Sequence, residues 1–239
     1  RGAAEKSGLC STYVKIRETD LHILSEVDVS MKARELASRF RLQVERYIDS
    51  FPEFAISLVP LPDDMLAPPI IRAMLAAGSM AAVGPMAAVA GAVAEFVCKG
   101  LIDEGYNEVI VENGGDIYLQ RSTDCIIAVF AGESPLSNRI GLKLVADEMP
   151  VGVCTSSGTI GHSLSFGCAD SVTVLADSAV VADAAATRIG NDVGSYKNPR
   201  DGVQRALDAA AELAGIRGIL VICAELMGVC GRVELVPLD

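Results

Sequence analysis

The chain has 239 residues, of which 51% are hydrophobic and 5% aromatic, and its formal net charge is −11. This length and apolar content allow one large buried core, which excludes a disordered or fibrous protein. The acidic balance also argues against nucleic acid and anionic membrane surfaces as partners, because both require a basic face.

The first half of the chain predicts a hairpin followed by helices. Apolar and polar residues alternate over residues 12–18 and 21–28, as in two paired strands. Residues 31–48 carry apolar side chains at helical spacing and predict a helix that covers a sheet. The proline-rich segment 51–69 is a connection. Residues 73–94 carry no charge, but their Ala and Gly content and the Gly84-Pro85 break favour packed core helices over a membrane span.

Strands and further helices follow in alternation. A tight turn at Asn113-Gly114 predicts a hairpin of the primed-turn type. A second helix with two following strands occupies the C-terminal segment. The order helix, strand, turn, strand therefore occurs at residues 85–120 and again at 201–236. The remaining predicted elements are strands at 107–112, 116–120, 124–130, 140–146, 217–224 and 227–236 and a helix at 201–214.

This order predicts an α+β fold of mainly antiparallel sheets with packed helices. We expect residues 1–239 to form a single domain. The repeated order of elements suggests an internal duplication, with two intimately packed repeats at about 1–120 and 121–239.

Most of the residues that could perform chemistry lie between Val151 and Gly190. Hydroxyls and glycines gather in Thr155-Ser156-Ser157-Gly158, and His162 follows them. Such a run offers N–H and O–H donors that suit an anionic ligand. Residues 171–176 predict a strand, and Asp177 or Ser178 then caps a helix that Gly190 is expected to end.

Within this helix, Asp183 and Thr187 lie four residues apart and share a face among alanines. Carboxylate and hydroxyl oxygens are ligands that Mg²⁺ accepts beside phosphates and water. The alternative, which the spacing leaves open, is a solvated Asp and a Thr hydroxyl bonded to a carbonyl of its own helix.

The seven cysteines are odd in number and contain no CxxC pair, which argues against a zinc ribbon and against a disulfide framework. We therefore expect reduced thiols and a cytoplasmic location; the first ten residues contain no apolar segment of the signal-peptide type. Cys168 follows the polar loop and is the candidate for a reactive thiol. The cysteines expected in the core are Cys98, Cys125, Cys154 and Cys223.

Three motifs together resemble the ApbE-like superfamily, whose best-known members are FAD:protein FMN transferases. They are Asn113-Gly114-Gly115-Asp116, the Thr155–Gly158 run with His162, and Ala182-Asp183-Ala184-Ala185-Ala186-Thr187. The resemblance covers about residues 81–190 and implies an ApbE-like, T-fold-related structure. It also implies that Asp183 and Thr187 bind Mg²⁺ and that the turn at 113–116 lies beside a flavin nucleotide, FAD or FMN.

The chain departs from the transferases in two places. Residues 84–91 contain no lysine, and no Pro or Thr follows His162 at the expected spacing. The chain looks closest to a compact branch of the superfamily, and some members of that branch are implicated in sulfide assimilation and homocysteine formation.

Three functions remain open at this point. One is Mg²⁺-dependent binding of a phosphorylated small molecule, such as a flavin nucleotide, with a transferase as the expected enzyme class. Another is sulfur assimilation toward homocysteine or cysteine, with catalysis by Cys168 or His162. The third is a non-catalytic ApbE-like subunit. In each case we expect a small-molecule ligand, no nucleic acid, no membrane, and a homodimer as the assembly to test.

Overall fold

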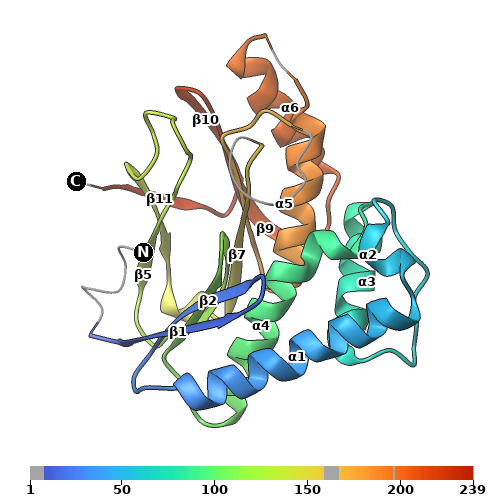
Figure 1. Cartoon of the computed structure of the whole chain (residues 1–239). Helices are drawn as coiled ribbons and strands as arrows, with labels where there is room; N and C mark the ends of the chain where they lie inside the picture. Colours follow the sequence, from blue (N-terminus) through green and yellow to red (C-terminus); the bar gives the residue numbers. More distant parts are fainter. Residues whose placement is uncertain (1–7, 159–166, 196, 239) are drawn as a thin grey trace.

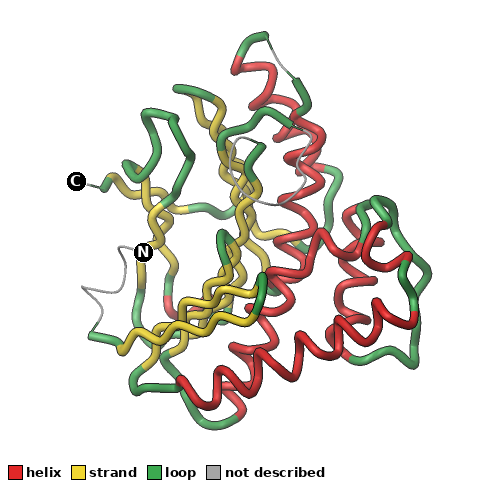
Figure 2. The backbone as a smooth tube through the Cα atoms, in the orientation of Figure 1, coloured by secondary structure: helices red, strands yellow, loops and turns green. Residues whose placement is uncertain are grey.

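The computed structural model describes residues 8–158, 167–195 and 197–238. A large antiparallel sheet forms the middle layer, with the helices packed on one face and a small second sheet on the other (Figure 1). Figure 2 shows the same division, with the helices in red gathered on one side of the yellow strands. The predicted α+β fold of antiparallel sheets and packed helices is confirmed.

The large sheet has eight strands, and they lie side by side in the order in which the chain makes them. The chain leaves this sheet after β4 to make two strands of the small sheet, and it returns as β7. The large sheet contains β1 (Cys10–Ile16), β2 (Thr19–Ser25), β3 (Val109–Asn113), β4 (Asp116–Gln120), β7 (Val151–Ser156), β8 (Ser171–Ala176), β9 (Ile216–Cys223) and β10 (Leu226–Gly231). The small sheet contains β5 (Cys125–Ala128), β6 (Ile140–Leu144) and β11 (Glu234–Pro237).

All helices longer than one turn belong to the layer on one face of the large sheet (Figure 1). They are inserted between β2 and β3 and between β8 and β9. The order hairpin, helices, hairpin therefore occurs twice along the chain. That this order arose by duplication stays a prediction. The helices are α1 (Ser30–Ser50), α2 (Glu53–Ile56), α3 (Pro69–Ala81), α4 (Val89–Asp103), α5 (Ala179–Val193) and α6 (Pro199–Ala211), with 3-10 turns η2 (Pro85–Ala88) and η3 (Ala146–Glu148).

Two apolar cores hold the layers together. The larger core lies between the helices and the sheet, and the smaller one lies between the two sheets. Small residues bring α4 and α5 unusually close, since a methyl group added at Gly91 would stand 2.3 Å from the carbonyl oxygen of Ala179. The segment Pro85–Asp103 is apolar and long enough to cross a membrane, but here most of it is buried against α5 and the sheet.

Several element boundaries differ from the predictions. The polar run after Val151 begins as strand β7, because Thr155 and Ser156 pair with β8 across the sheet. Helix α5 passes Gly190 and ends at Val193, since Gly190 is buried and Gly194 takes the positive φ. The predicted strand 227–236 divides at Gly231 into β10 and β11, which belong to different sheets.

Candidate functional site

Helix α5 carries the two residues predicted to bind a metal ion. Ser178 caps its N-terminus by accepting a hydrogen bond from the N–H of Val181 at 3.4 Å. The alanines that follow have small side chains, so the helix can pack closely against α4 and the sheet.

Asp183 and Thr187 both turn toward the segment that leads into α4. The carboxylate oxygen Oδ2 of Asp183 accepts a hydrogen bond from the N–H of Gly91 at 2.8 Å. The hydroxyl of Thr187 donates to the carbonyl of Ala87 at 3.5 Å. The open alternative, a hydroxyl bonded back to its own helix, is therefore not the contact seen. Both side chains are partly buried, so part of each remains accessible to a ligand.

Asp116 lies below α5 at the start of strand β4. The chain reaches it through the turn at Gly114, whose φ of +71° is a conformation that favours glycine. Asp116 is only 8% exposed and stands opposite Cys154 on β7. Among the described residues its Oδ1 atom has no hydrogen-bond partner. Burial raises the pKa of Asp116 to about 7, while the polar groups of Cys154 and Thr155 beside it act in the opposite direction.

Asp183 and Asp116 influence each other through space. Burial raises the pKa of Asp183 well above its usual range, and the negative charge of Asp116 raises it further. Cys154 stands opposite Asp116, and burial, followed by the charges of Asp116 and Asp183, raises the pKa of its thiol well above its usual range. Its Sγ donates to the carbonyl of Ala179 at 3.3 Å. Two like-charged groups in a water-poor environment disfavour simultaneous ionisation unless a cation neutralises them.

The turn that leads to Asp116 is fixed to the N-terminal end of α4. The side-chain amide of Asn113 donates to the carbonyl of Ala90 at 3.2 Å. Gly115 lies against β7, where an added methyl group would stand 3.1 Å from the carbonyl oxygen of Thr155. The turn over residues 113–116 is therefore tied through Asn113 to the end of α4 that meets Asp183.

The hydroxyl run divides between the two faces of the sheet, since successive residues of a strand point in opposite directions. Ser156 shares the face of Cys154, and its hydroxyl is buried with no hydrogen-bond partner among the described residues. Thr155 points to the opposite face and forms a hydrogen bond with Thr173 at 2.9 Å. Ser156 thus joins Asp116 and Asp183 under α5, and Thr155 does not.

The end of the hydroxyl run lies against the chain that returns toward β8. The N–H of Gly158 donates to the carbonyl of Ala169 at 3.0 Å, and Ser157 precedes it directly. Cys168 is exposed, and its N–H donates to the carbonyl of Gly194 just beyond α5. The predicted catalytic residue His162 lies outside the described residues.

Sequence reasoning missed two residues that the structure places here. Cys154 was assigned only to the core, and no local pattern shows that two carboxylates face it. Glu95 was not considered, although it is buried beside the N-terminus of α5. A signal for Glu95 exists: it is the only acidic residue between Ile70 and Leu101, in an otherwise apolar segment, and Lys99 follows it by one turn.

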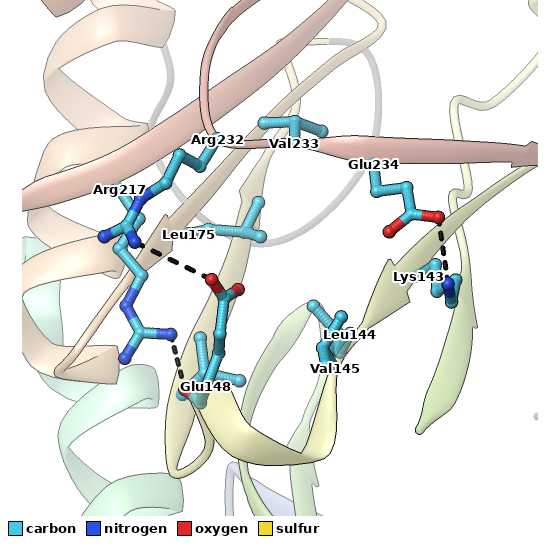
Figure 3. Close-up of a pocket in the computed structure, with 10 residues that line it drawn as sticks. Lys143, Leu144, Val145, Glu148, Leu175, Arg217, Arg232, Val233 and Glu234 are labelled. Atoms are coloured by element: carbon cyan, nitrogen blue, oxygen red, sulfur yellow. Dashed lines mark hydrogen bonds and ion pairs between the residues drawn. The ribbon is translucent and has the colours of Figure 1, made fainter.

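A cavity of about 290 Å³ lies elsewhere, between the two sheets (Figure 3). Its charged side chains already have partners: Arg217 donates to the carbonyl of Glu148 at 2.6 Å, and Lys143 pairs with Glu234 at 3.0 Å. We place the candidate site under α5 instead, because two of the three buried polar atoms that lack a partner among the described residues, Asp116 Oδ1 and Ser156 Oγ, lie there, while the third belongs to Gln43 on α1.

The oxygen groups under α5 suit a small hard cation. The described residues contain no cluster of three or more His, Cys, Asp or Glu side chains able to hold a metal ion. A cation between Asp116 and Asp183 would therefore need the Thr187 hydroxyl, backbone carbonyls, water or a ligand phosphate as well. Mg²⁺ is commonly bound in this way, by one or two carboxylates and substrate phosphates.

Comparison with known proteins identifies relatives over almost the whole chain. A family model described as AbpE bacteria matches residues 3–235. A UPF0280 protein of Methanococcus aeolicus is 41% identical over 231 residues, covering 95% of this chain and 92% of that one. A UPF0280 protein of Methanocaldococcus jannaschii is 43% identical over 230 residues, with 94% and 92% covered.

Solved structures show the same fold at low identity. The flavinyl transferase ApbE of Pseudomonas stutzeri has a TM-score of 0.58 at 12% identity, covering 93% of this chain and 94% of that one. The ApbE protein of Thermotoga maritima has a TM-score of 0.56 at 12% identity, with 92% and 96% covered. The chain has an ApbE-like fold and belongs to the family described as AbpE bacteria, together with the UPF0280 proteins.

Proposed function

We propose that this protein binds Mg²⁺ together with a phosphorylated small molecule of the flavin-nucleotide class, at the site under α5. The observation that carries the proposal is the pair Asp116 and Asp183. Both carboxylates have raised pKa values, and Oδ1 of Asp116 has no hydrogen-bond partner among the described residues. A divalent cation would compensate both charges at once.

The residues present fit such an ion. Asp183 and Thr187 lie one turn apart on α5 and would hold it, and the carbonyl of Ala87 lies where the Thr187 hydroxyl now points. Asp116 supplies a second carboxylate from the sheet. When bound, Mg²⁺ would neutralise and orient a phosphate group of the ligand.

The place for the ligand follows from the groups around the carboxylates. The buried Ser156 hydroxyl and the glycine turn at 113–116 lie beside Asp116 and offer donors and close backbone approach. Proteins of the same fold from Pseudomonas stutzeri and Vibrio cholerae are flavin transferases, which favours a flavin nucleotide among phosphorylated ligands. Transfer of a group from that nucleotide is the reaction class we propose.

Sulfur chemistry is the second candidate function, and one observation favours it. Cys168 is exposed at the loop that meets the end of α5, whereas Cys154 at the carboxylate pair is buried. Of these two cysteines, Cys168 is therefore the one that could handle sulfur. A subunit without catalysis remains the outcome if neither a cation nor thiol reactivity is found.

Metal binding is tested with Mn²⁺, which replaces Mg²⁺ and whose free concentration is measured by electron paramagnetic resonance. We expect the wild-type protein to bind Mn²⁺, and to bind it more tightly when FMN or FAD is added. Asp183→Asn should weaken binding at least tenfold. It should also raise the melting temperature of the metal-free protein, since it removes the repulsion with Asp116.

Asp192→Asn is the matched control, because it makes the same change on α5 at an exposed ion pair with Arg188. It should leave Mn²⁺ binding unchanged. No Mn²⁺ binding by the wild-type protein, with or without FAD, FMN or ADP, would contradict the proposal.

A further inference from the structure

Glu95 is a buried carboxylate that neither the ApbE-like motifs nor the metal proposal uses. It lies on α4 and is only 3% exposed. Among the described residues, Glu95 and Asp116 are the two buried acidic side chains. A buried carboxylate is costly unless strong hydrogen bonds compensate it, so its partners indicate what it stabilises.

Apart from Lys99, the hydrogen-bond partners of Glu95 belong to the start of α5. Oε2 of Glu95 accepts hydrogen bonds from the Ser178 hydroxyl at 2.7 Å and from the Val180 N–H at 3.1 Å. Oε1 accepts from Lys99 Nζ at 2.6 Å. Ser178 in turn accepts from the N–H of Val181. Glu95 thus reaches from one helix to cap another, where the first N–H groups and the helix dipole favour an anion.

The same two helices meet again one turn away. Gly91 lies four residues before Glu95 on α4, and its N–H donates to Asp183, three residues after Val180 on α5. Two contacts one turn apart therefore join the helices: Glu95 with Ser178 and Val180, and Gly91 with Asp183. Gly91 allows the close approach between them, because any side chain there would collide with the carbonyl of Ala179. Two contacts fix both the position of α5 along α4 and the rotation of α5 about its own axis.

We infer that Glu95 is a positioning residue for the cation site: by capping α5 it holds Asp183 and Thr187 opposite Gly91 and Ala87. This inference rests on the proposed function. Ser178 already caps α5 in the ordinary way, so a second, buried anion is not needed to start the helix. What Glu95 adds is a contact between helices, at one turn from the metal-binding carboxylate.

The test compares two substitutions on α4. Glu95→Ala removes the contact of Glu95 with Ser178 and Val180. Val97→Ala removes buried apolar volume on the same helix and leaves the N-terminal cap of α5 unchanged. Mn²⁺ dissociation constants are measured by electron paramagnetic resonance at a temperature where both variants are folded. Glu95→Ala should weaken Mn²⁺ binding at least tenfold, and Val97→Ala less than threefold. Glu95→Gln keeps one acceptor oxygen for Ser178 and Val180 and should recover most of the affinity.

A second measurement needs no metal ion. The Gly91 amide is protected by its hydrogen bond to Asp183. Its hydrogen exchange, followed by NMR in the metal-free protein, therefore reports the contact between Gly91 and Asp183 directly. Glu95→Ala should speed this exchange at least tenfold, and Val97→Ala should not. If Glu95→Ala does not fold, Ser178→Ala removes one of the hydrogen bonds to Glu95 and should speed the Gly91 exchange to a smaller extent.

Each outcome bears on one proposal. Wild-type protein that fails to bind Mn²⁺ contradicts the proposed function, and Gly91 exchange then still decides whether Glu95 positions α5. Wild-type affinity and wild-type Gly91 exchange in Glu95→Ala would overturn the positioning role. Equal losses in Val97→Ala and Glu95→Ala would also overturn it, since the effect would then be general destabilisation.

Discussion

At the scale of single residues, burial separates Cys154 from Cys168. Cys154 is buried, and its pKa is raised by burial and by the neighbouring Asp116 and Asp183. Its thiol donates a hydrogen bond to Ala179, so it acts as a packed, protonated group. Cys168 is exposed. Because the thiolate is the nucleophile, only an accessible cysteine could perform sulfur chemistry at neutral pH.

We predict that iodoacetamide modifies Cys168 faster than any cysteine of the predicted core. The protein is labelled at pH 7 in the folded, reduced state, and each site is quantified by peptide mass spectrometry. Burial raises the pKa of Cys98, Cys125 and Cys154, in the case of Cys125 to about 11, so these thiols should react at least tenfold more slowly. Cys168→Ser should remove the fast site. Equally slow labelling of Cys168 and the core cysteines would exclude direct thiol chemistry.

The sequence could predict relations between neighbouring residues of the site, but not contacts between residues far apart in the chain. The spacing of Asp183 and Thr187 correctly placed both on one helix face, because that relation is local. The pairing of Asp183 with Asp116 joins α5 to β4, and no spacing encodes it. Asp116 was expected near the site only through the resemblance to a known family.

At the scale of elements, the contact between α4 and α5 depends on Gly91. We predict that Gly91→Ala lowers the free energy of unfolding by about 1–3 kcal/mol, the usual cost of overpacking. The new methyl group would lie 2.3 Å from the Ala179 carbonyl oxygen and 2.8 Å from the Asp183 Cβ atom, and neither can move without moving α5. Urea unfolding followed by circular dichroism measures the change.

Gly100→Ala is the control on the same helix. Its methyl group would meet only the end of the Leu36 side chain, which can rotate away. Because Ala also favours the helix by about 1 kcal/mol over Gly, this variant should be as stable as the wild type or slightly more stable. Equal destabilisation by the two substitutions would show that the helix contact at Gly91 has no special role.

Most elements were predictable, and the exceptions have physical reasons. The hairpin at Asn113-Gly114 and the helix after Ser178 follow from local turn and capping chemistry. Strand β7 was not predicted, because its polar residues Thr155 and Ser156 belong to a run that suits a ligand-binding loop, although β7 lies between β4 and β8 in the sheet. The division at Gly231 was missed because β11 leaves for a second sheet, which is decided by packing partners distant in the sequence.

At the scale of the whole molecule, the site lies where the helix layer meets the middle of the large sheet. Strands β4 and β7 are the fourth and fifth of the eight, and they join the two halves of the chain in the sheet. Helices from both halves cover them: α4 precedes β3, and α5 follows β8. The carboxylates from β4 and α5 therefore act on each other across the boundary between the halves, and neither half holds the pair alone.

Burial of thiols should also make the stability of the whole molecule sensitive to alkaline pH. Cys98 is fully buried between α4 and the sheet, and burial, followed by the charge of Glu95, raises the pKa of its thiol far above the ordinary value. Above pH 8.5 the unfolded chain loses this proton while the folded protein keeps it. The folded state then binds more protons, so its stability must fall as the pH rises.

We predict that this single thiol lowers the free energy of unfolding by about 2 kcal/mol between pH 8 and pH 10. Urea unfolding under reducing conditions is measured at pH 8, 9 and 10 for the wild type and for Cys98→Ala, and the two pH dependences are subtracted. The subtraction removes the contributions of other groups that titrate in this range, including Cys125. Cys98→Ala should be less stable than the wild type at pH 8, because it loses buried volume, and the difference should shrink or reverse at pH 10. Parallel pH dependences would mean that the Cys98 thiol ionises as easily in the folded protein as in the unfolded chain, and that water reaches the core between α4 and the sheet.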